Sequence, residues 1–304
     1  MKVLVTGGCG FIGSNLVDQL IELGHQVIVV DNLSADNEQF YYNHQAVYYH
    51  FDFCDTKKLQ VISRGVDFLF HLAAESRLGA AIENPRKAID LNVKGMVSIL
   101  ETVKENNIKG IVYSSTSSIY GLNENFPLTE IEPEDCLNAY ATTKYAGELL
   151  LRNYNRMYGV KSVTLRYFSV FGERSPSKGQ YALVLGIFKH QLESSKPLTV
   201  TGDGLQERDF IYVKDVAAAN IKCMENFETN PDMWNSQVFN IGSGYTKTIK
   251  ELAETLSGNI IYIEKPAGET FTNLSDNSKF RNATGWKPKV GVVDWIKENL
   301  KVNK

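Results

Sequence analysis

The sequence is short of the features that mark several large classes of protein. Its 304 residues include only four cysteines, and none of them stands in a CxxC pair. This argues against a disulfide framework or a zinc site and is typical of reduced thiols in the cytoplasm. No apolar run reaches the ~18 residues that a membrane helix needs, and no signal-peptide pattern precedes the first apolar strand. These absences predict a cytoplasmic protein without a bound metal.

The sequence also lacks an excess of positive charge. With 32 Lys and Arg against 35 Asp and Glu, the net charge is −3, whereas a nucleic-acid-binding surface usually leaves a basic imprint. Neither nucleic acid nor membrane is therefore an expected partner, although a local basic pocket for one pyrophosphate is compatible with this balance. The content of 43% hydrophobic and 22% charged residues is that of an ordinary globular protein.

The first half of the chain alternates short apolar runs with amphipathic stretches, which is the pattern of βαβ units in a parallel sheet. Right-handed crossovers would wind the helices onto both faces, so we expect a Rossmann-type doubly wound α/β fold. The expected strands are 3–6, 26–30, 46–51, 68–71, 110–114 and 162–166, and the expected helices are 11–23, 57–62, 85–105 and 139–158.

Beyond about Gly172 the alternation of apolar runs and amphipathic stretches becomes less regular, and segments with glycine and proline become frequent. We therefore divide the chain into residues 1–172, which hold the doubly wound sheet, and residues 173–304, a smaller α/β region that closes over its active edge. Further helices are expected at 181–193, 214–226 and 247–256, and residues 237–241 are a candidate for an additional strand of the main sheet.

A glycine-rich turn follows the first strand and opens the first helix. Gly7, Gly10 and Gly13 fit the GxxGxxG spacing, where side chains would block the tight turn, the approach of backbone to a pyrophosphate and helix–strand packing. The helix N-terminus then presents free N–H groups to the phosphates. A tight βα turn without a ligand accounts for the same glycines, so the turn alone is weak evidence of a dinucleotide site.

Asp31 strengthens that interpretation. It ends the second strand, 18 residues after Gly13, where a carboxylate accepts both ribose hydroxyls and repels a 2′-phosphate, so NAD is favoured over NADP. No arginine follows among residues 32–34 to receive such a phosphate. A turn or cap residue is the alternative. Asp52 and Phe53 form a carboxylate–aromatic pair suited to the adenine edge, although Asp52 fits an ordinary loop carboxylate equally well.

Tyr140 and Lys144 stand four residues apart in an expected helix and so share one face. A tyrosine hydroxyl, with an ordinary pKa near ~10, is a poor base at neutral pH, but a nearby ammonium and a positive nicotinamide ring would lower that pKa. The alternative is a buried tyrosine beside a solvated lysine. The hydroxyl-rich loop 114–118 follows a strand end, where open α/β sheets bind ligands, although ordinary turn chemistry also uses such residues.

These motifs occur together in the order found in one superfamily. The chain resembles the extended short-chain dehydrogenases/reductases and, within them, the NAD-dependent epimerase/dehydratase family, most closely its UDP-glucose (UDP-galactose) 4-epimerases. The motifs that carry the resemblance span residues 2 to about 286 and are Thr6–Gly13, Asp31, His71–Ala74, Asn92, Tyr113–Gly121, Tyr140 with Lys144, Leu165–Phe168, Gly202–Gly204 and Arg208–Ile211.

The resemblance implies an isomerase of carbohydrate metabolism that epimerises C4 of a nucleotide-linked hexose through a 4-keto intermediate, with NAD as cofactor. Tyr140, Lys144 and Thr116 would be the catalytic residues, and Thr116 would hold the sugar O4. Related 4,6-dehydratases carry an Asp-Glu acid/base pair where Ser117 and Ser118 stand here, so dehydration is not expected. A reductase of the same fold that consumes NAD(P)H and, more remotely, a non-catalytic NAD-binding regulator are the alternatives.

The other contacts follow from the same resemblance, which assigns NAD to residues 1–172 and the nucleotide sugar to residues 173–304. The expected cofactor-binding residues are Gly7, Gly10, Phe11, Ile12, Gly13, Asp31, Asn32, Ser34, Asp52, Phe53, Leu72, Ala73, Ala74, Asn92, Ser114, Tyr140, Lys144 and Tyr167. The expected substrate-binding residues are Ser76, Thr116, Ser117, Ser118, Tyr140, Phe168, Ser169, Gln180, Tyr181, Arg208, Lys265 and Asn273.

Arg208 is expected to clamp the substrate's pyrophosphate, because a guanidinium suits bidentate recognition of oxygens. A surface ion pair with Asp209 is the alternative. Three substrate positions depart from the family pattern: Ser169 stands where most 4-epimerases have Asn, Ser76 where some members have Lys, and Lys265 where many relatives have Arg.

Asn273 occupies the position whose bulk, by resemblance, governs whether an N-acetyl group fits the hexose pocket. It is smaller than the Tyr of strict UDP-glucose/galactose enzymes, so N-acetylated and uronate analogues stay open as substrates beside UDP-glucose. The resemblance also implies a homodimer whose four-helix interface uses residues 85–105 and 139–158. Apolar faces on these long helices are otherwise explained as core.

Overall fold

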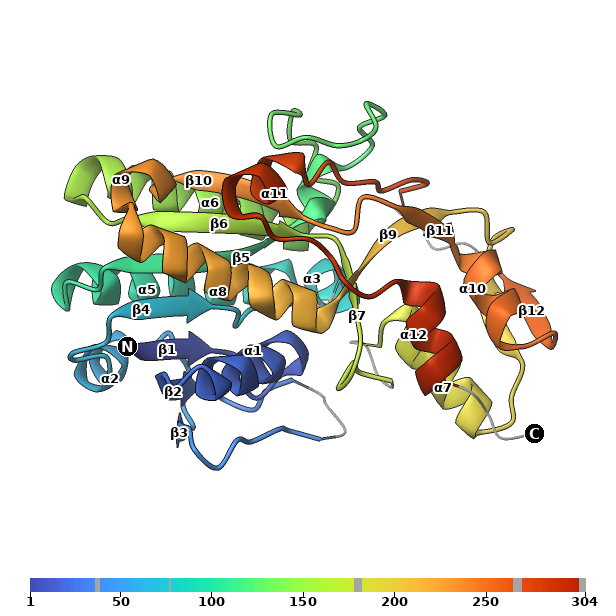
Figure 1. The fold of residues 1–304 in the computed structure, drawn as a ribbon, viewed down its shortest axis with the longest axis horizontal. Helices are drawn as coiled ribbons and strands as arrows, with labels where there is room; N and C mark the ends of the chain where they lie inside the picture. The colour runs from blue at the N-terminus through green and yellow to red at the C-terminus, as the bar shows by residue number, and fades with distance from the viewer. Residues whose placement is uncertain (36–38, 77, 178–181, 265–269, 301–304) are drawn as a thin grey trace.

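A seven-stranded parallel sheet forms the centre of the computed structural model, which describes residues 1–35, 39–76, 78–177, 182–264 and 270–300 (Figure 1). The strand order is β10-β6-β5-β4-β1-β2-β3, which confirms the doubly wound parallel sheet predicted from the sequence. The strands are β1 (Lys2–Thr6), β2 (Gln26–Val30), β3 (Val47–Tyr49), β4 (Phe68–His71), β5 (Gly110–Thr116), β6 (Ser162–Tyr167) and β10 (Gln237–Ile241).

Both faces of this sheet are buried, because side chains alternate along each strand and helices cover each face. In β1, Val3 and Val5 pack in one hydrophobic cluster and Leu4 in another. Helices α1 (Phe11–Glu22) and α8 (Val213–Thr229) cover the first face, and α9 (Pro231–Trp234) and α11 (Ser278–Thr284) complete it. The second face carries α2 (Thr56–Ile62), α3 (Leu78–Glu83), α4 (Pro85–Ile89), α5 (Gly95–Glu105) and α6 (Ala139–Tyr158).

Local signals in the sequence account for the limits of α6. The Asn138 side chain accepts a hydrogen bond from the Ala141 N–H at 2.9 Å, and the helix ends at Gly159, whose φ of 70° is left-handed. The predicted helix 85–105 is continuous but passes through a π-helical segment, η1 (Asp90–Lys94), between α4 and α5. This irregularity holds Asn92, a predicted cofactor residue.

The smaller region lies beside the carboxyl edge of the main sheet, on the right of Figure 1. It is built on a three-stranded sheet, β11-β9-β7, and a two-stranded sheet, β12-β8, with its own hydrophobic cluster. Its strands are β7 (Ser169–Phe171), β8 (Leu198–Thr201), β9 (Glu207–Tyr212), β11 (Thr246–Thr248) and β12 (Ile260–Ile263). Its helices are α7 (Val184–Glu193), α10 (Ile249–Leu256) and α12 (Val292–Asn299).

The carboxy-terminal half also contributes to the main layers. β10 pairs with β6 in parallel, which confirms the additional strand predicted at residues 237–241, and α8 packs against α1. The predicted helix at 247–256 begins two residues late, because residues 246–248 pair with β9 as a strand. The third strand is also shorter than predicted, covering 47–49 rather than 46–51.

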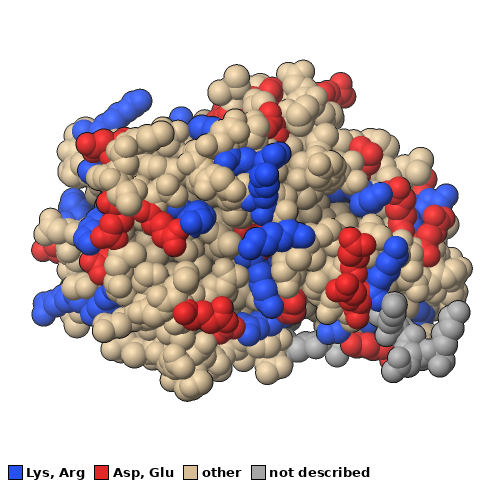
Figure 2. All heavy atoms as spheres, viewed as in Figure 1, with Lys and Arg blue, Asp and Glu red and all other residues tan. Residues whose placement is uncertain are grey.

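The surface view reinforces the near balance of charge. On the face covered by α1 and α8, basic and acidic side chains are intermixed rather than gathered by sign (Figure 2). No helix among the described residues is long and apolar enough to cross a membrane. The four cysteines are free thiols, and Cys9 and Cys223 are buried.

Candidate functional site

A cavity of about 650 Å³ runs along the carboxyl ends of the main-sheet strands and reaches residues of the smaller region. This is where open parallel sheets bind ligands, because the loops after successive strands meet at one edge. Most predicted site residues line it: Gly7, Gly10, Phe11, Ile12, Gly13, Asp31, Asn32, Ser34, Phe53, Leu72, Ala73, Ala74, Ser76, Ser114, Thr116, Ser117, Ser118, Tyr140, Lys144, Tyr167, Phe168, Ser169, Arg208 and Asn273.

The glycine-rich turn forms a cradle that requires glycine at positions 7 and 13, whereas a Cβ on Gly10 would make only an ordinary contact at 3.5 Å. A Cβ on Gly13 would lie 2.1 Å from the carbonyl oxygen of Gly7, and Gly7 itself has a φ of +74° with the backbone of Ala73 close by. Gly10 is the N-cap of α1, and no side chain caps the helix there. The first N–H groups of α1 are thus left to a ligand, and the backbone approach that the glycines permit fits a pyrophosphate.

Asp31 faces this cavity and also organises the turn beside it. Its carboxylate accepts hydrogen bonds from the backbone N–H groups of Cys9 at 3.0 Å and Leu33 at 2.9 Å. The turn role considered from the sequence and the ligand role are therefore compatible, because both carboxylate oxygens keep lone pairs for ribose hydroxyls. The cradle and this carboxylate fit the dinucleotide that the sequence predicts.

Two predicted cofactor residues do not line the cavity. Asp52 accepts hydrogen bonds from the Cys54 N–H and the Asn32 side chain, so it shapes the loop next to the cavity. Asn92 is buried, and its side chain accepts a hydrogen bond from the Glu75 N–H and donates one to the Glu75 carbonyl oxygen. It also donates to the Thr143 hydroxyl at 2.9 Å. Its amide joins η1 to α6, and its role in the structure is to hold these elements together.

Lys144 is buried, which rules out the solvated lysine considered from the sequence. Its Nζ donates to the Ser114 carbonyl oxygen at 2.7 Å and lies 4.9 Å from the centre of the Tyr113 ring. Burial lowers the pKa of Lys144 to about 7, against the opposing effect of the Glu148 carboxylate. The amine can therefore change its charge near neutral pH, unlike a lysine at the surface.

Tyr140 lies one turn before Lys144 and lines the same cavity. Burial raises the pKa of its hydroxyl, and a hydrogen bond with Thr116 opposes that effect. Thr116 also donates to the Ser118 hydroxyl at 3.1 Å. Without further positive charge in the cavity the phenol stays protonated at neutral pH, so its action as a base depends on the ammonium of Lys144 and on a cationic ligand.

Tyr167 is held rigidly at the floor of the cavity. Its hydroxyl accepts a hydrogen bond from Ser114 at 3.0 Å and donates to the Asn220 side chain at 2.9 Å. Asn220 comes from α8, whose role here was not visible in the sequence. The next residue, Phe168, lines the cavity and packs with Ile119 and Tyr120, so it belongs to the hydrophobic core as well as to the cavity wall.

The far end of the cavity is closed by residues of distant segments. The Arg208 guanidinium donates to the carbonyl oxygens of Glu207 at 2.8 Å and Phe271 at 3.1 Å. Asp209 points to the opposite side of β9, as strand alternation requires, and its buried carboxylate accepts hydrogen bonds from Ser243, Gly244 and Ser275. Its contacts do not support the surface ion pair between these neighbours.

Asn273 joins this end of the cavity to the hydroxyl loop. Its side-chain amide donates to the Ser117 hydroxyl at 3.0 Å, whereas its buried Oδ1 has no hydrogen-bond partner among the residues that the structure describes. Three further predicted substrate residues, Gln180, Tyr181 and Lys265, lie outside the described residues.

The cavity contains residues that the sequence did not single out, among them Ala35, Phe51, Leu91, Asn138 and Thr272. Most are apolar or backbone contacts without a motif of their own. Among the described residues, no group of three or more His, Cys, Asp or Glu side chains is arranged to hold a metal ion.

Comparison with known proteins gives consistent results along the chain. Residues 3–242 match the model of the NAD dependent epimerase/dehydratase family. A UDP-glucose 4-epimerase of Lactobacillus helveticus is 33% identical, and the match covers 97% of this chain and 94% of that protein. The similarity is therefore to whole proteins and not to a shared nucleotide-binding segment.

Solved structures are similar over the same extent. The UDP-glucose 4-epimerase of Thermotoga maritima, solved with UDP-glucose, has a TM-score of 0.90 and 33% identity, covering 99% of this chain and 97% of its own. The UDP-N-acetylglucosamine 4-epimerase of Methanobrevibacter ruminantium, in complex with UDP-N-acetylmuramic acid, has a TM-score of 0.90 and 33% identity, covering 98% and 96%. The two neighbours carry different sugars in their names, and they match this chain equally well.

Proposed function

Because this chain belongs to the NAD dependent epimerase/dehydratase family, we propose that it is a nucleotide-sugar 4-epimerase whose substrate is a UDP-linked hexose. Its cofactor is NAD. The observation that carries the proposal is the set of side chains around one point of the cavity: Tyr140, Lys144 and Thr116, with hydroxyls and no carboxylate at positions 117 and 118.

Each of these three side chains has a distinct role in the proposed epimerisation. The turn from Gly7 to Gly13 and Asp31 would hold NAD, which would supply reversible hydride acceptance at the sugar C4. Tyr140 removes the proton from O4, and the Lys144 ammonium stabilises the phenolate that this step requires. Thr116 donates a hydrogen bond to O4 while C4 is a ketone, in place of its contact with Ser118. Tyr140 then returns the proton after the flat ketose has turned over in the cavity.

The same positions argue against dehydration. Loss of water from the hexose needs a base for the C5 proton and an acid for the departing hydroxyl. Ser117 and Ser118 occupy the places of that acid/base pair, and their hydroxyls are bound to Asn273 and Thr116. A serine hydroxyl is too weak an acid to protonate a leaving group efficiently, so a 4-keto sugar formed here goes back to an alcohol.

We test the function by NMR, incubating the purified protein, without added cofactor, with UDP-glucose, UDP-N-acetylglucosamine and UDP-glucuronate in turn. The expected result is conversion of at least one sugar to its C4 epimer with no net change in NADH absorbance. A dehydrated product would indicate a dehydratase, stoichiometric loss of added NADH a reductase, and NAD binding without turnover a regulator. Exclusive use of UDP-glucose would contradict the expectation, based on the small size of Asn273, that the hexose pocket also admits an N-acetyl group.

We further propose that the protein is a cytoplasmic homodimer. Apolar side chains on the helices of the second face are exposed in the single chain, including Ile89, Val97, Leu149 and Met157. A second copy would cover them in a four-helix interface, and the free thiols suit a reducing compartment. Light scattering should give the mass of two chains, and Leu149→Glu should give one; a wild-type monomer would refute the dimer.

A further inference from the structure

A buried ion pair lies one helical turn beyond Lys144 and has no part in the mechanism above. Glu148 on α6 and Arg166 on β6 both have side chains that are only 2% exposed. The guanidinium binds the carboxylate at both ends, with Nε donating to Oε1 at 3.1 Å and Nη2 to Oε2 at 2.8 Å. Such bidentate geometry is what allows two opposite charges to be held away from water.

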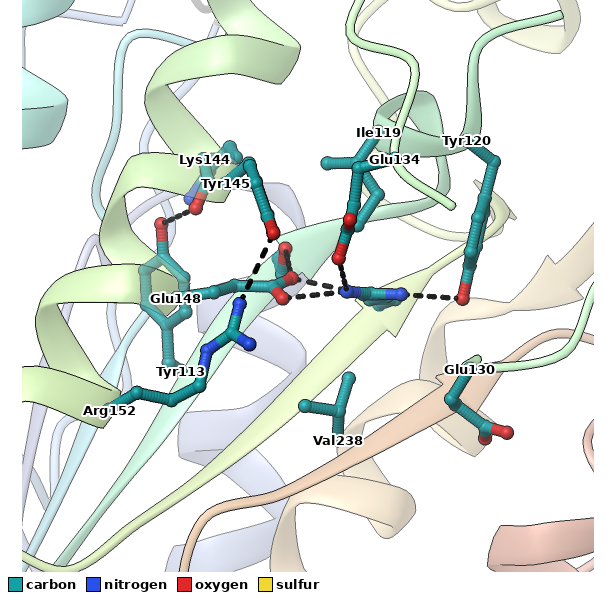
Figure 3. A network of polar contacts seen from close by, with 12 residues as sticks. Tyr113, Ile119, Tyr120, Glu130, Glu134, Lys144, Tyr145, Glu148, Arg152 and Val238 are labelled. Carbon is teal, nitrogen blue, oxygen red and sulfur yellow. Dashed lines mark hydrogen bonds and ion pairs between the residues drawn. The ribbon is translucent and has the colours of Figure 1, made fainter. Parts of the chain in front are cut away.

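The pair connects α6 to the hydroxyl loop. Arg166 Nη1 donates to the Tyr120 hydroxyl at 2.9 Å, and Tyr120 donates to the Asn240 side chain at 2.7 Å. In Figure 3 the dashed lines from Glu148, Tyr120 and Glu134 meet at one guanidinium. Glu134 Oε1 lies 3.6 Å from Arg166 Nη2. Tyr120 closes the 3-10 helix η2 (Ser117–Tyr120), so the network fixes the loop that carries the hydroxyls.

Two consecutive residues of β5 fix Lys144 and Glu148 side by side. The Ser114 carbonyl oxygen accepts from Lys144 Nζ at 2.7 Å, and the Ser115 hydroxyl donates to Glu148 Oε1 at 2.5 Å. Because Lys144 and Glu148 are four residues apart on α6, they lie on one face of the helix. The ammonium and the carboxylate therefore share the same buried space against the end of β5.

Apart from the Arg166 guanidinium, which is bound to Glu148 and carries a positive charge, the other titratable groups around the amine are neutral at physiological pH. Burial and the charge of Lys144 lower the pKa of His71, on β4, to about 3. Burial raises the pKa of Tyr113, on β5, and that of Tyr140, on α6. Farther away, on elements packed against α6, the buried Glu75 carboxylate is paired with Lys87 at 3.1 Å. Glu148 is thus the negative charge that acts on Lys144 in this part of the molecule.

We propose that Glu148, held in place by Arg166, is a positioning residue that keeps Lys144 charged at the wall of the cavity that Lys144 shares with Tyr140. It touches neither substrate nor cofactor and acts through Lys144 alone. The proposal rests on the proposed function, because the charge of Lys144 matters for catalysis only if Tyr140 acts as the base. The ionisation of Lys144 can nevertheless be measured without turnover.

The experiment follows the lysine side-chain nitrogens of the NAD-loaded, isotope-labelled protein by NMR during a pH titration. The Lys144 signal is the one missing in Lys144→Met. In Glu148→Gln we expect this signal to titrate about one pH unit or more lower than in the wild type, because an opposite charge next to the amine has been removed. In parallel, the alkaline limit of kcat/KM should move to lower pH by a similar amount.

Two variants separate charge from structure. Glu134→Gln removes a carboxylate from the same guanidinium but not from beside Lys144, and it should leave the lysine titration unchanged. Glu148→Asp keeps the charge but shortens the side chain, so it should weaken thermal stability while the lysine titrates near its wild-type pH. If Glu148→Gln does not fold, the double variant Glu148→Gln with Arg166→Gln is compared with Arg166→Gln alone, so that the two proteins differ only in the Glu148 charge, and the lysine should titrate at lower pH in the double variant.

The outcomes distinguish this proposal from the proposed function. An unchanged Lys144 titration in Glu148→Gln, or equal titrations in the double variant and in Arg166→Gln, would overturn the positioning role even if the protein is an active epimerase. A lowered titration in a protein that converts no nucleotide sugar would leave the effect on Lys144 standing and refute the epimerase instead. Equal shifts in Glu148→Gln and Glu134→Gln would show a general effect of charge and would also overturn the proposal.

Discussion

The two ends of the cavity are built from different parts of the chain. At the end near α1, backbone atoms of one short turn form the surface, and a Cβ on Gly13 would meet the Gly7 carbonyl oxygen at 2.1 Å. At the other end the surface consists of side chains. Arg208 comes from β9, and Asn273 comes from a loop distant in sequence and donates a hydrogen bond to Ser117. The backbone end has almost no freedom to change, whereas the side-chain end can be altered residue by residue without changing the fold.

This difference explains how one architecture serves related substrates. A pyrophosphate is recognised by N–H groups that every residue has, provided that no side chain is in the way. A hexose is recognised by the hydrogen bonds and volume of particular side chains. Tyr140 and Lys144 lie at the junction of the two ends, where the chemistry takes place, and the following tests proceed from that junction outward.

Removal of the Tyr140 hydroxyl should have the largest effect. Tyr140→Phe leaves both ends of the cavity in place, so we expect NAD to stay bound while epimerisation falls by roughly 10²- to 10⁴-fold, the usual contribution of a positioned acid/base group. The rate is measured by NMR and the retained NAD by absorbance after gel filtration. Tyr145→Phe, on the same helix but directed to Arg152, is the control and should be fully active. A wild-type rate in Tyr140→Phe would refute the assignment.

Gly13→Ala tests the backbone end. The added methyl group has no room against the Gly7 carbonyl, so we expect the free energy of unfolding to fall by about 1–3 kcal/mol. NAD should bind at least about tenfold more weakly, which corresponds to 1.4 kcal/mol. Gly258→Ala, where the methyl group would meet nothing within 4 Å, is the matched control. Normal NAD affinity in Gly13→Ala would mean that the turn is not the pyrophosphate site.

The same contrast decides what could be predicted from the sequence. The glycine turn, Asp31 and the Tyr140–Lys144 pair are recognisable because their function depends on spacing within one strand, turn or helix. Glu148 and Arg166 meet only after β6 has paired with β5 beneath α6, and no local pattern relates residues 18 positions apart on a helix and a strand.

The smaller region was harder to predict for a related reason. Helices α11 and α12, with seven and eight residues, were not predicted, although α2 and α10 of the same lengths were. Residues 246–248 become a strand only because β9 offers a free edge, so tertiary pairing decides their conformation. Asn92 was predicted from a family motif to bind the cofactor. In the structure it lies in the π-helical segment η1, and its amide bonds to Thr143 inside the protein and does not line the cavity.

Arg208→Lys tests the side-chain end. Lysine keeps the charge but loses the planar fork, so it cannot bind a carbonyl and phosphate oxygens together as arginine can. We expect KM for the nucleotide sugar to rise roughly 10- to 100-fold, as for the loss of a charged hydrogen bond, with a smaller change in kcat. NAD affinity should not change, because Arg208 lies at the other end of the cavity. Equal losses of NAD and sugar affinity would contradict the separation of the two ends.

The most gradual expected effect, a slope with pH, concerns the junction before any ligand is bound. The folded pKa of Lys144 is lowered to about 7 by burial, whereas in the unfolded chain a lysine has a pKa of about 10.4. Between these two pH values the unfolded chain binds a proton that the folded protein does not. The free energy of unfolding of the cofactor-free protein should therefore increase with pH over this window, by at most about 1.4 kcal/mol per pH unit, and show no such slope below pH 7.

Lys144→Met isolates this contribution, since all other titrating groups are common to both proteins. Denaturant unfolding of the two proteins from pH 6 to pH 10 gives the difference, and the wild type should gain stability relative to the variant as the pH rises. A constant difference would show that Lys144 keeps its proton throughout. The ammonium would then be present at every working pH, and the junction would already be in its charged form before NAD enters the cavity.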